Sequence, residues 1–268
     1  MLSLVESLRK VSFFKKPINR KSLSVFEDFM DIIYPPRCHF CMDFLWEGGR
    51  PENQRVLPVC PACFKGLSEI TSPLCKLCGR PFQDGIDQDH FCEECLRRRP
   101  FFDRAGAPYI YEGPMMTAIH QFKYDGKTYL SESLGPLLAA FAGTWLDMRG
   151  GCLIMPVPLH PRRLRERGFN QSLLLARHLA SSLDSKLDFL SLRRIRYTQP
   201  QTGLKSAERR KNVRRAFEVS DPKAVKGHTL ILVDDVATTG NTLNESARVL
   251  KRAGAEKVYG LVLARTAI

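Results

Sequence analysis

The sequence predicts an α/β fold in which a mostly parallel sheet, flanked by helices, follows a small module built around cysteines. From about residue 104 onward, short apolar, β-rich runs alternate with segments of helical periodicity, which is typical of a parallel sheet. Before that point, eight of the nine cysteines form four Cys-x-x-Cys pairs between Cys38 and Cys95. The chain therefore divides into a cysteine-rich first third and a larger α/β part.

Composition and charge restrict the class of protein. The 268 residues are 44% hydrophobic and 26% charged, which excludes a wholly disordered chain. The longest apolar run, residues 137–146, is shorter than the roughly 18 residues that a membrane span needs. The first 16 residues lack the apolar core of a secretory signal, so we expect a cytoplasmic protein. The net charge of +13 points to an anionic partner.

The four cysteine pairs predict zinc. One Cys-x-x-Cys turn supplies two thiolates, so two turns complete a tetrahedron around Zn²⁺, and disulfides are disfavoured in the cytosol. Redox-active pairs and reduced structural thiols are the competing interpretations. A site closed by four thiolates has no open position for chemistry, so its role is structural or in binding. We expect His39 and His90, which neighbour the ligands, to be solvated. The candidate ligands are Cys38, Cys41, Cys60, Cys63, Cys75, Cys78, Cys92 and Cys95.

The pairing of the cysteine turns stays open at this point. Sequential pairing joins the first two turns in one four-cysteine zinc ribbon and the last two in another. Crossed pairing, of the first turn with the third and of the second with the fourth, is also compatible with the spacing. In either case we expect an amphipathic or flexible arm at residues 1–33, a double zinc ribbon at residues 34–100 and the α/β domain at residues 101–268.

The elements of the α/β part follow from local periodicity. We expect strands at residues 107–111, 152–158, 229–233 and 257–264. We expect helices at residues 114–122, 132–148, 170–183 and 242–253. In the third of these helices, Leu175, Leu179 and Leu183 recur at the spacing of one helical face. Because ligands of parallel sheets bind at the carboxyl ends of the strands, the residues that follow each strand are the candidates for a site.

The stretch after the third strand has the parts of an anion site. Asp234 and Asp235 end the strand, and a turn over residues 237–241 leads into a helix. Backbone N–H groups at a helix N-terminus hold phosphate, and Gly240 lets the backbone approach it. Two carboxylates beside an anion favour a ligand with sugar hydroxyls or a Mg²⁺ ion. The plainer alternative is a buried strand followed by a helix that Thr242 and Glu245 cap in a capping box.

Residues 234–242 (DDVATTGNT) resemble the phosphoribosyl-pyrophosphate (PRPP) loop of type I phosphoribosyltransferases. Residues 155–171 (MPVPLHPRRLRERGFNQ), 119–127, 201–204 and 208–217 resemble segments of the ComF family, which also carries paired Cys-x-x-Cys ribbons. The resemblance covers residues 34–266. It implies a phosphoribosyltransferase-type sheet, with Asp234 and Asp235 on the ribose hydroxyls of Mg²⁺-bound PRPP. The implied 5′-phosphate loop is Ala237, Thr238, Thr239, Gly240, Asn241 and Thr242.

The resemblance also implies positions for the pyrophosphate and for a closing loop. The pyrophosphate and hood candidates are Lys123, Tyr124, Leu159, His160, Arg162 and Arg163. A mobile basic loop at residues 193–215 would close over the ligand, with Gln201, Thr202, Arg209, Arg210 and Asn212 as its candidates. The plainer alternatives are a solvated basic turn at residues 162–167, a surface lysine at 123 and an exposed charged loop. That loop carries nine Lys and Arg against one Glu, a repulsion that an anionic partner would relieve.

Two functions follow from the resemblance. In the first, a ComF-like protein binds Mg²⁺-PRPP or another phosphoribosyl ligand and acts in the uptake and handling of single-stranded DNA during natural competence. Its partners would be PRPP, single-stranded DNA, and a DNA-uptake helicase or channel or recombination proteins; Phe101 and Phe102 would stack on bases or form an apolar seam. In the second, the protein is a phosphoribosyltransferase, amidophosphoribosyltransferase-like or acting in nucleobase or nucleoside metabolism, with an unknown acceptor. The chain begins Met1-Leu2, so it offers no N-terminal cysteine nucleophile for a glutaminase half.

Overall fold

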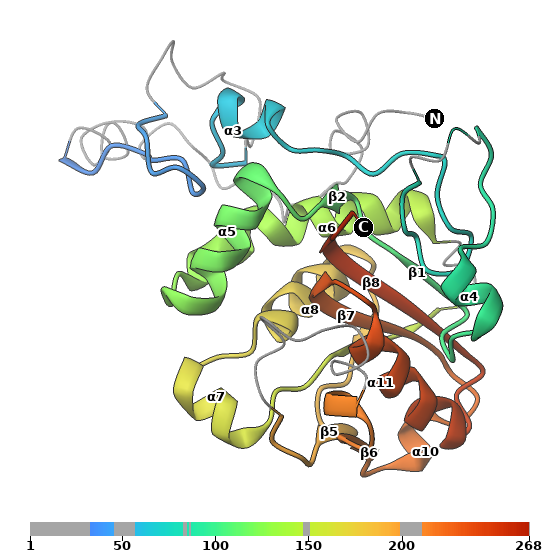
Figure 1. The fold of residues 1–268 in the computed structure, drawn as a ribbon. Coiled ribbons are helices and arrows are strands. Elements are labelled where there is room, and N and C mark those ends of the chain that lie inside the picture. The colour runs from blue at the N-terminus through green and yellow to red at the C-terminus, as the bar shows by residue number, and fades with distance from the viewer. Residues whose placement is uncertain are drawn as a thin grey trace.

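The structure, a computed structural model, describes residues 33–45, 57–82, 85, 87–146, 151–198 and 211–267. Its centre is a sheet in the order β1-β8-β7-β3-β4, with β2 also paired to β8, and all of these pairs are parallel (Figure 1). The strands are β1 (Arg104–Gly106), β2 (Tyr109–Ile110), β3 (Leu153–Pro156), β4 (Lys186–Leu187), β7 (Thr229–Ala237) and β8 (Lys257–Arg265). The predicted parallel sheet is confirmed.

Helices cover both faces of the sheet, as predicted. Ile231 and Val233 of β7 pack in one core cluster with residues of three helices, whereas Leu230 and Leu232 pack in the other cluster with residues of a fourth. The first three are α5 (Gly113–Tyr124), α6 (Ser131–Trp145) and α8 (Gln171–Ser182), and the fourth is α11 (Asn241–Arg252). Shorter elements are α3 (Pro61–Lys65), α4 (Glu93–Arg97), η1 (Thr128–Leu130), α7 (Pro161–Arg167) and α10 (Pro222–Val225). In the part of the chain that the structure describes, no helix has the length and apolar character needed to cross a membrane.

Strand β7 is longer than the sequence predicts. Its pairing with β8 continues as far as Ala237 and Arg265, so the strand runs four residues beyond Val233. Asp234 and Asp235 therefore lie inside the strand rather than after it.

The start of α11 differs from the predicted capping box. Gly240 is the N-cap, in the left-handed region at φ +72°, a conformation that favours glycine. Glu245 does not cap this helix. Its carboxylate instead accepts hydrogen bonds from Arg248 at 2.6 Å and from the backbone N–H of Arg215 at 2.7 Å. The capping-box prediction is wrong because Glu245 is taken up by contacts that bring another segment of the chain onto the helix.

The cysteine-rich turns pack against the α/β part instead of standing apart. Cys38 and Phe40 belong to the core cluster of α5, α6 and α8, and Cys75 belongs to that of α11. A side chain at Gly79 would come within 2.7 Å of the Ala105 carbonyl oxygen, which shows how closely the third turn lies on β1. In Figure 1, α3 lies beside α5, and α4 lies beside β1. Each ribbon thus shares a core with the sheet, and the domain boundary near residue 100 stays a prediction.

The two ends of the predicted mobile loop at residues 193–215 lie next to each other, because the strands at its ends pair as a hairpin. An antiparallel pair joins β5 (Leu192–Arg194) to β6 (Phe217–Val219). Arg196 Nη2 donates to the carbonyl oxygens of Asn212 at 2.7 Å and of Arg214 at 2.8 Å. The described ends of this segment are therefore tied together, and residues 199–210 lie outside the described residues.

Candidate functional site

Eight cysteine thiols come together in two groups of four. The groups are Cys38, Cys41, Cys60 and Cys63, and Cys75, Cys78, Cys92 and Cys95, with the sulfur atoms of each group within 4.8 Å of one another. The Sγ atoms of Cys41 and Cys60 are 3.8 Å apart, as are those of Cys78 and Cys92. A tetrahedron with Zn–S bonds of about 2.3 Å has edges of about 3.8 Å. Both groups therefore fit zinc, and the turns pair sequentially rather than crosswise.

The second zinc centre is more deeply buried than the first. All four of its cysteines are buried, whereas Cys41 of the first centre is exposed. Arg265, at the end of β8, is only 3% exposed; its Nη1 donates to the Cys78 carbonyl at 2.8 Å, and its Nη2 lies 3.7 Å from Cys78 Sγ. Four thiolates around one Zn²⁺ leave an excess of negative charge, which stabilises the buried guanidinium. No local pattern in the sequence singles out Arg265, because 187 positions separate it from Cys78.

His39 and His90, which neighbour the cysteine ligands, were predicted to be solvated, but both pack against other side chains. His39 Nδ1 lies 2.8 Å from Ser133 Oγ, and the ring meets Tyr129 edge-on with 4.8 Å between centroids. His90 stacks on Phe82 with 3.9 Å between centroids. Both histidines are half-buried. His39 thereby fastens the first ribbon to α6.

The two aspartates near the end of β7 have different partners. Asp234 accepts a hydrogen bond from Ser172 Oγ, at the start of α8, at 2.8 Å. Asp235 lies 2.8 Å from Lys123 Nζ near the end of α5, and these side chains are only 9% and 17% exposed. Lys123 is therefore not the surface lysine of the plainer interpretation. Ser172 was not among the predicted residues, although it directly follows the segment that ends in Gln171.

Burial and charge shift the pKa values of this group. Burial and the neighbouring Asp235 carboxylate raise the pKa of Asp234 from 3.8 to about 7, against the opposing effects of Ser172 and Lys123. Burial alone would lower the pKa of Lys123, but the charge and hydrogen bond of Asp235, together with the charges of Asp234 and Tyr111, outweigh it, so the pKa of Lys123 is raised. Near neutral pH, Asp234 is therefore poised between its protonated and ionised forms, and a cation beside it would favour the ionised form.

Replacing Asp234 by asparagine is expected to make folding stability less dependent on pH. Because the pKa of Asp234 is raised in the folded state, its ionisation opposes folding. Its stabilising contribution is present below pH 3.8 and is lost as the pH rises through about 7. The wild-type Tm should therefore fall relative to that of Asp234→Asn across this range. Thermal unfolding of both proteins from about pH 5 to about pH 8 checks this, and parallel Tm profiles would contradict it.

Five of the six predicted 5′-phosphate residues, all except Thr239, line a small pocket that Asp234 borders. The pocket is lined by Asp234, Val236, Ala237, Thr238, Gly240, Asn241, Thr242 and Leu243. In the same loop, Thr239 Oγ1 and Asn241 Nδ2 are buried without a hydrogen-bond partner among the described residues. Buried polar atoms are nearly always paired, and the first backbone N–H groups of a helix also lack partners within the helix. The loop therefore offers several donors in one place, as an anion requires.

Arg194 is influenced by the charge of Asp234 and by those of two other arginines. Burial lowers the pKa of Arg194 in β5, and the nearby charges of Arg163 and Arg196 lower it further, whereas Asp234 opposes them. Three guanidinium groups this close repel one another, and an anion among them would relieve that repulsion. Arg163 was predicted as a pyrophosphate residue. Arg194 was not named as a candidate, because it lies in the basic run at residues 193–215 and no local pattern distinguishes it from its neighbours.

Helix α7 begins at the predicted pyrophosphate residues, so residues 162–167 are helical rather than the basic turn of the plainer alternative. His160 caps it, because its Nδ1 accepts from the backbone N–H of Arg162 at 3.2 Å. The His160 ring meets Tyr197 edge-on at 5.5 Å, and the Arg162 guanidinium lies 4.7 Å over the same ring. Arg162 also pairs with Glu166 at 3.2 Å. Tyr197, which follows β5, therefore packs against the start of α7. Leu159, just before the helix, is half-buried.

The remaining predicted residues are not gathered at this pocket. Tyr124 is 52% exposed, and Arg167 lies 5.1 Å over its ring. The Asn212 carbonyl is bound within the hairpin, as described above. Phe101 is 48% exposed and Phe102 is 5% exposed, so only Phe102 fits the apolar seam. Gln201, Thr202, Arg209 and Arg210 lie outside the described residues.

Known proteins resemble both parts of the chain. Residues 170–267 match the family model of the phosphoribosyl transferase domain, and residues 29–96 match that of the double zinc ribbon domain. The chain is 34% identical over 213 residues to the DNA utilization protein YhgH of Salmonella typhimurium, covering 78% of this chain and 90% of that protein. It is 31% identical over 211 residues to Competence protein F of Haemophilus influenzae, covering 77% and 90%. Competence protein ComFC of Bacillus subtilis is 29% identical over 216 residues, covering 78% and 84%.

Proposed function

The chain belongs to the ComF family, and on this premise we propose that it binds Mg²⁺-PRPP, or a related phosphoribosyl compound, in the pocket at the end of β7. We further propose that it acts in the uptake and handling of single-stranded DNA during natural competence. In the proposed organisation, a double zinc ribbon at residues 34–100 precedes a phosphoribosyltransferase-like domain at residues 101–268. The pocket supports the ligand, and the positive charge of the chain supports the DNA.

The unpaired polar atoms of the loop before α11 carry the ligand part of the proposal. Thr239 Oγ1 and Asn241 Nδ2 are joined by Thr266 Oγ1, which is also buried without a partner among the described residues. Thr266 lies beside the loop, because its backbone N–H donates to the Ala237 carbonyl at 3.3 Å. A 5′-phosphate is the group that accepts several N–H and O–H bonds at the start of a helix. It would satisfy donors that the protein itself leaves unpaired.

The acidic pair favours a sugar and a cation next to that phosphate. Carboxylate oxygens accept hydrogen bonds from hydroxyl groups and are the ligands that Mg²⁺ prefers. Asp234 and Asp235 would hold the ribose hydroxyls and the ion, and the ion, when bound, would offset the negative charge of the pyrophosphate. Lys123 Nζ lies 2.8 Å from Asp235 and offsets the negative charge of this pair of acids.

The arginines near Asp234 favour a second function, the transfer of the phosphoribosyl group. In that reaction the bond from ribose C1 to the pyrophosphate oxygen breaks, and the pyrophosphate leaves with the electron pair. An amine, a nucleobase or water forms the new bond to C1 and loses its proton. Arg163 and Arg194 would stabilise the charge that develops on the departing pyrophosphate.

The excess of positive charge carries the DNA part of the proposal. The net charge of the chain is +13, and residues 193–215 carry nine Lys and Arg against one Glu. The relatives are named as a DNA utilization protein and as competence proteins. Lys and Arg that contact the phosphate backbone release counterions, so we expect the affinity for DNA to fall steeply with salt.

We expect the zinc-loaded protein to release or absorb heat on titration with Mg²⁺-PRPP, and Asp234→Asn to weaken binding by about tenfold or more, because a charged hydrogen bond is lost. Glu256→Gln is the matched control, since Glu256 is an exposed carboxylate before β8, at the opposite end of the parallel sheet. No heat from the wild type at high PRPP would contradict the ligand part. Equal affinity of Asp234→Asn would contradict the assigned role of the acids.

The same preparation tests the DNA part with a labelled single-stranded oligonucleotide. Fluorescence anisotropy at increasing salt should show binding that weakens along a straight line in log affinity against log salt. An absence of binding at low salt, or binding that salt does not change, would contradict this part. Adding Mg²⁺-PRPP to the complex then measures whether the two ligands compete or bind together.

A further inference from the structure

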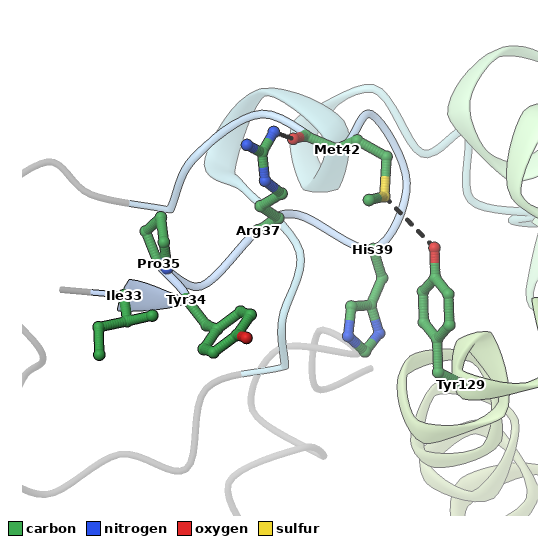
Figure 2. Close-up of a pocket in the computed structure, with 7 residues that line it drawn as sticks. All are labelled: Ile33, Tyr34, Pro35, Arg37, His39, Met42 and Tyr129. Carbon is green, nitrogen blue, oxygen red and sulfur yellow. Dashed lines mark hydrogen bonds between the residues drawn. The ribbon is translucent and has the colours of Figure 1, made fainter. Parts of the chain in front are cut away.

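A second pocket lies between the first zinc ribbon and η1, and it shares no lining residue with the pocket at β7 (Figure 2). Its volume is about 400 Å³. Tyr34, Arg37, His39 and Met42 of the ribbon line it, together with Tyr129 of η1. Three of these five side chains are aromatic rings and one is a guanidinium. The lining therefore combines flat apolar surfaces with polar groups at their edges.

Contacts hold most of this lining in place. The Tyr129 hydroxyl donates to Met42 Sδ at 3.3 Å, and the Tyr129 ring supports His39 edge-on at 4.8 Å. Arg37 donates from Nη1 to the Met42 carbonyl at 3.1 Å. Tyr34 is 72% exposed, the highest value among the large hydrophobic side chains that the structure describes. The lining thus combines side chains held by contacts with the exposed Tyr34 ring, which would bury a large area against a planar ligand.

We propose that this pocket binds a base of single-stranded nucleic acid. The inference rests on the proposed DNA function and assigns part of it to the first zinc ribbon. All nucleobases stack on aromatic rings, so Tyr34 and Tyr129 would bind single-stranded nucleic acid independently of its sequence. Hydroxyl groups of the same residues reach the polar edge of a base, and Arg37 adds positive charge for the adjoining phosphates.

The size and polarity of the pocket favour a base over other guests. A volume of about 400 Å³ lies within the roughly 300–1,000 Å³ of pockets that take small molecules or their parts. A wholly apolar peptide side chain would offer no hydrogen-bond partner to the Tyr34 hydroxyl and no negative charge to Arg37. A free inorganic anion would leave the rings uncovered. A base has apolar faces and a polar edge, which matches both parts of the lining.

The test compares two labelled oligomers of equal length, an oligothymidylate and an abasic strand, on the full-length zinc-loaded protein. The wild type should bind the oligothymidylate about tenfold more tightly or better. Tyr34→Ala should lose most of that preference and keep its affinity for the abasic strand, while Tyr34→Phe should retain the preference. Tyr34 is largely exposed, so its replacement leaves the core intact. Phe189→Ala, at a 47% exposed ring near β4, is the matched control.

The outcomes separate this inference from the proposed function beneath it. If neither oligomer binds at low salt, the proposed DNA function fails, and the base pocket fails with it. If both oligomers bind equally, or if Tyr34→Ala leaves the preference unchanged, only the base pocket is overturned. If Tyr34→Ala lowers the affinity for both oligomers by the same factor, the Tyr34 ring does not stack on a base, and the inference is again overturned. Loss of the preference in Tyr34→Ala alone supports it.

Discussion

Replacing Cys75 by serine is expected to unfold the α/β part of the protein together with the second zinc ribbon. Cys75 is fully buried and shares a core cluster with Met155, Leu232 and Leu243 of the sheet and α11. A structural zinc contributes about 10–16 kcal/mol to the folding of a small ribbon at neutral pH. Whole domains are stable by only about 5–15 kcal/mol. Losing this metal therefore removes a free energy as large as the net stability of the domain.

Arg265 extends the loss from the ribbon to the sheet. Its buried guanidinium contacts Cys78, whose thiolate carries negative charge while zinc is bound. Without the metal the thiols regain protons, and an unbalanced buried charge costs about 3–5 kcal/mol. Arg265 pairs in register with Ala237 of β7, at the start of the phosphate loop. Damage to the second zinc centre should therefore also disturb the proposed ligand site.

Circular dichroism and the zinc content of Cys75→Ser check this prediction. Cys41→Ser is the matched control, since it removes one thiolate from the first centre, where Cys41 is exposed. We expect Cys41→Ser to lose one zinc ion and to keep a cooperative unfolding transition of the α/β part. If Cys75→Ser unfolds with the wild-type Tm, the shared core is not what holds the second ribbon and the sheet together.

Replacing Lys123 by methionine is expected to lower the free energy of unfolding by about 3–5 kcal/mol. The substitution keeps most of the side-chain volume but removes the cation that lies 2.8 Å from Asp235. Asp235 is only 9% exposed, so its charge would remain buried without compensation. The nearby Asp234 adds a second carboxylate to the same region, which makes the loss of the cation costlier.

A double variant separates charge from packing at this pair. Lys123→Met combined with Asp235→Asn removes both charges and should recover much of the lost stability, because no unbalanced ion remains. Arg97→Met is the matched control: Arg97 pairs with Glu93 at 2.6 Å, but these side chains are 77% and 76% exposed, so the cost should stay below about 1 kcal/mol. Urea denaturation measures all four proteins. A cost for Lys123→Met no larger than that for Arg97→Met would count against a buried ion pair.

The regular elements were predictable where a pattern ran through enough residues. Helix α8 begins and ends within one residue of its prediction, because its leucines mark one face over several turns. Strands β4, β5 and β6 are two or three residues long, too short to show any periodicity. Strand β7 was predicted from the apolar run at residues 229–233, with the two acids at its end. Its pairing with β8 and the cation of Lys123 allow Asp235 to stay inside it.

The parts of the candidate site were predictable to different degrees. The resemblance implied the loop from Ala237 to Thr242, and all of its residues except Thr239 line one pocket, because they are consecutive in the chain. The partners of the acids were not predicted, since Ser172 and Arg194 belong to other elements and follow no local rule. The assignment of these residues to parts of PRPP stays a prediction until the titrations are done.

By itself the sequence determined the eight zinc ligands and the parallel sheet, because each depends on residue types at short, regular spacing. Only the tertiary structure decided which cysteine turns share a zinc ion, since both pairings suit the spacing equally well. Only the tertiary structure turned Asp234 and Asp235 to different partners and placed Arg265 against Cys78. These features depend on burial and on charges brought from distant segments, and neither exists before the helices and ribbons pack on the sheet.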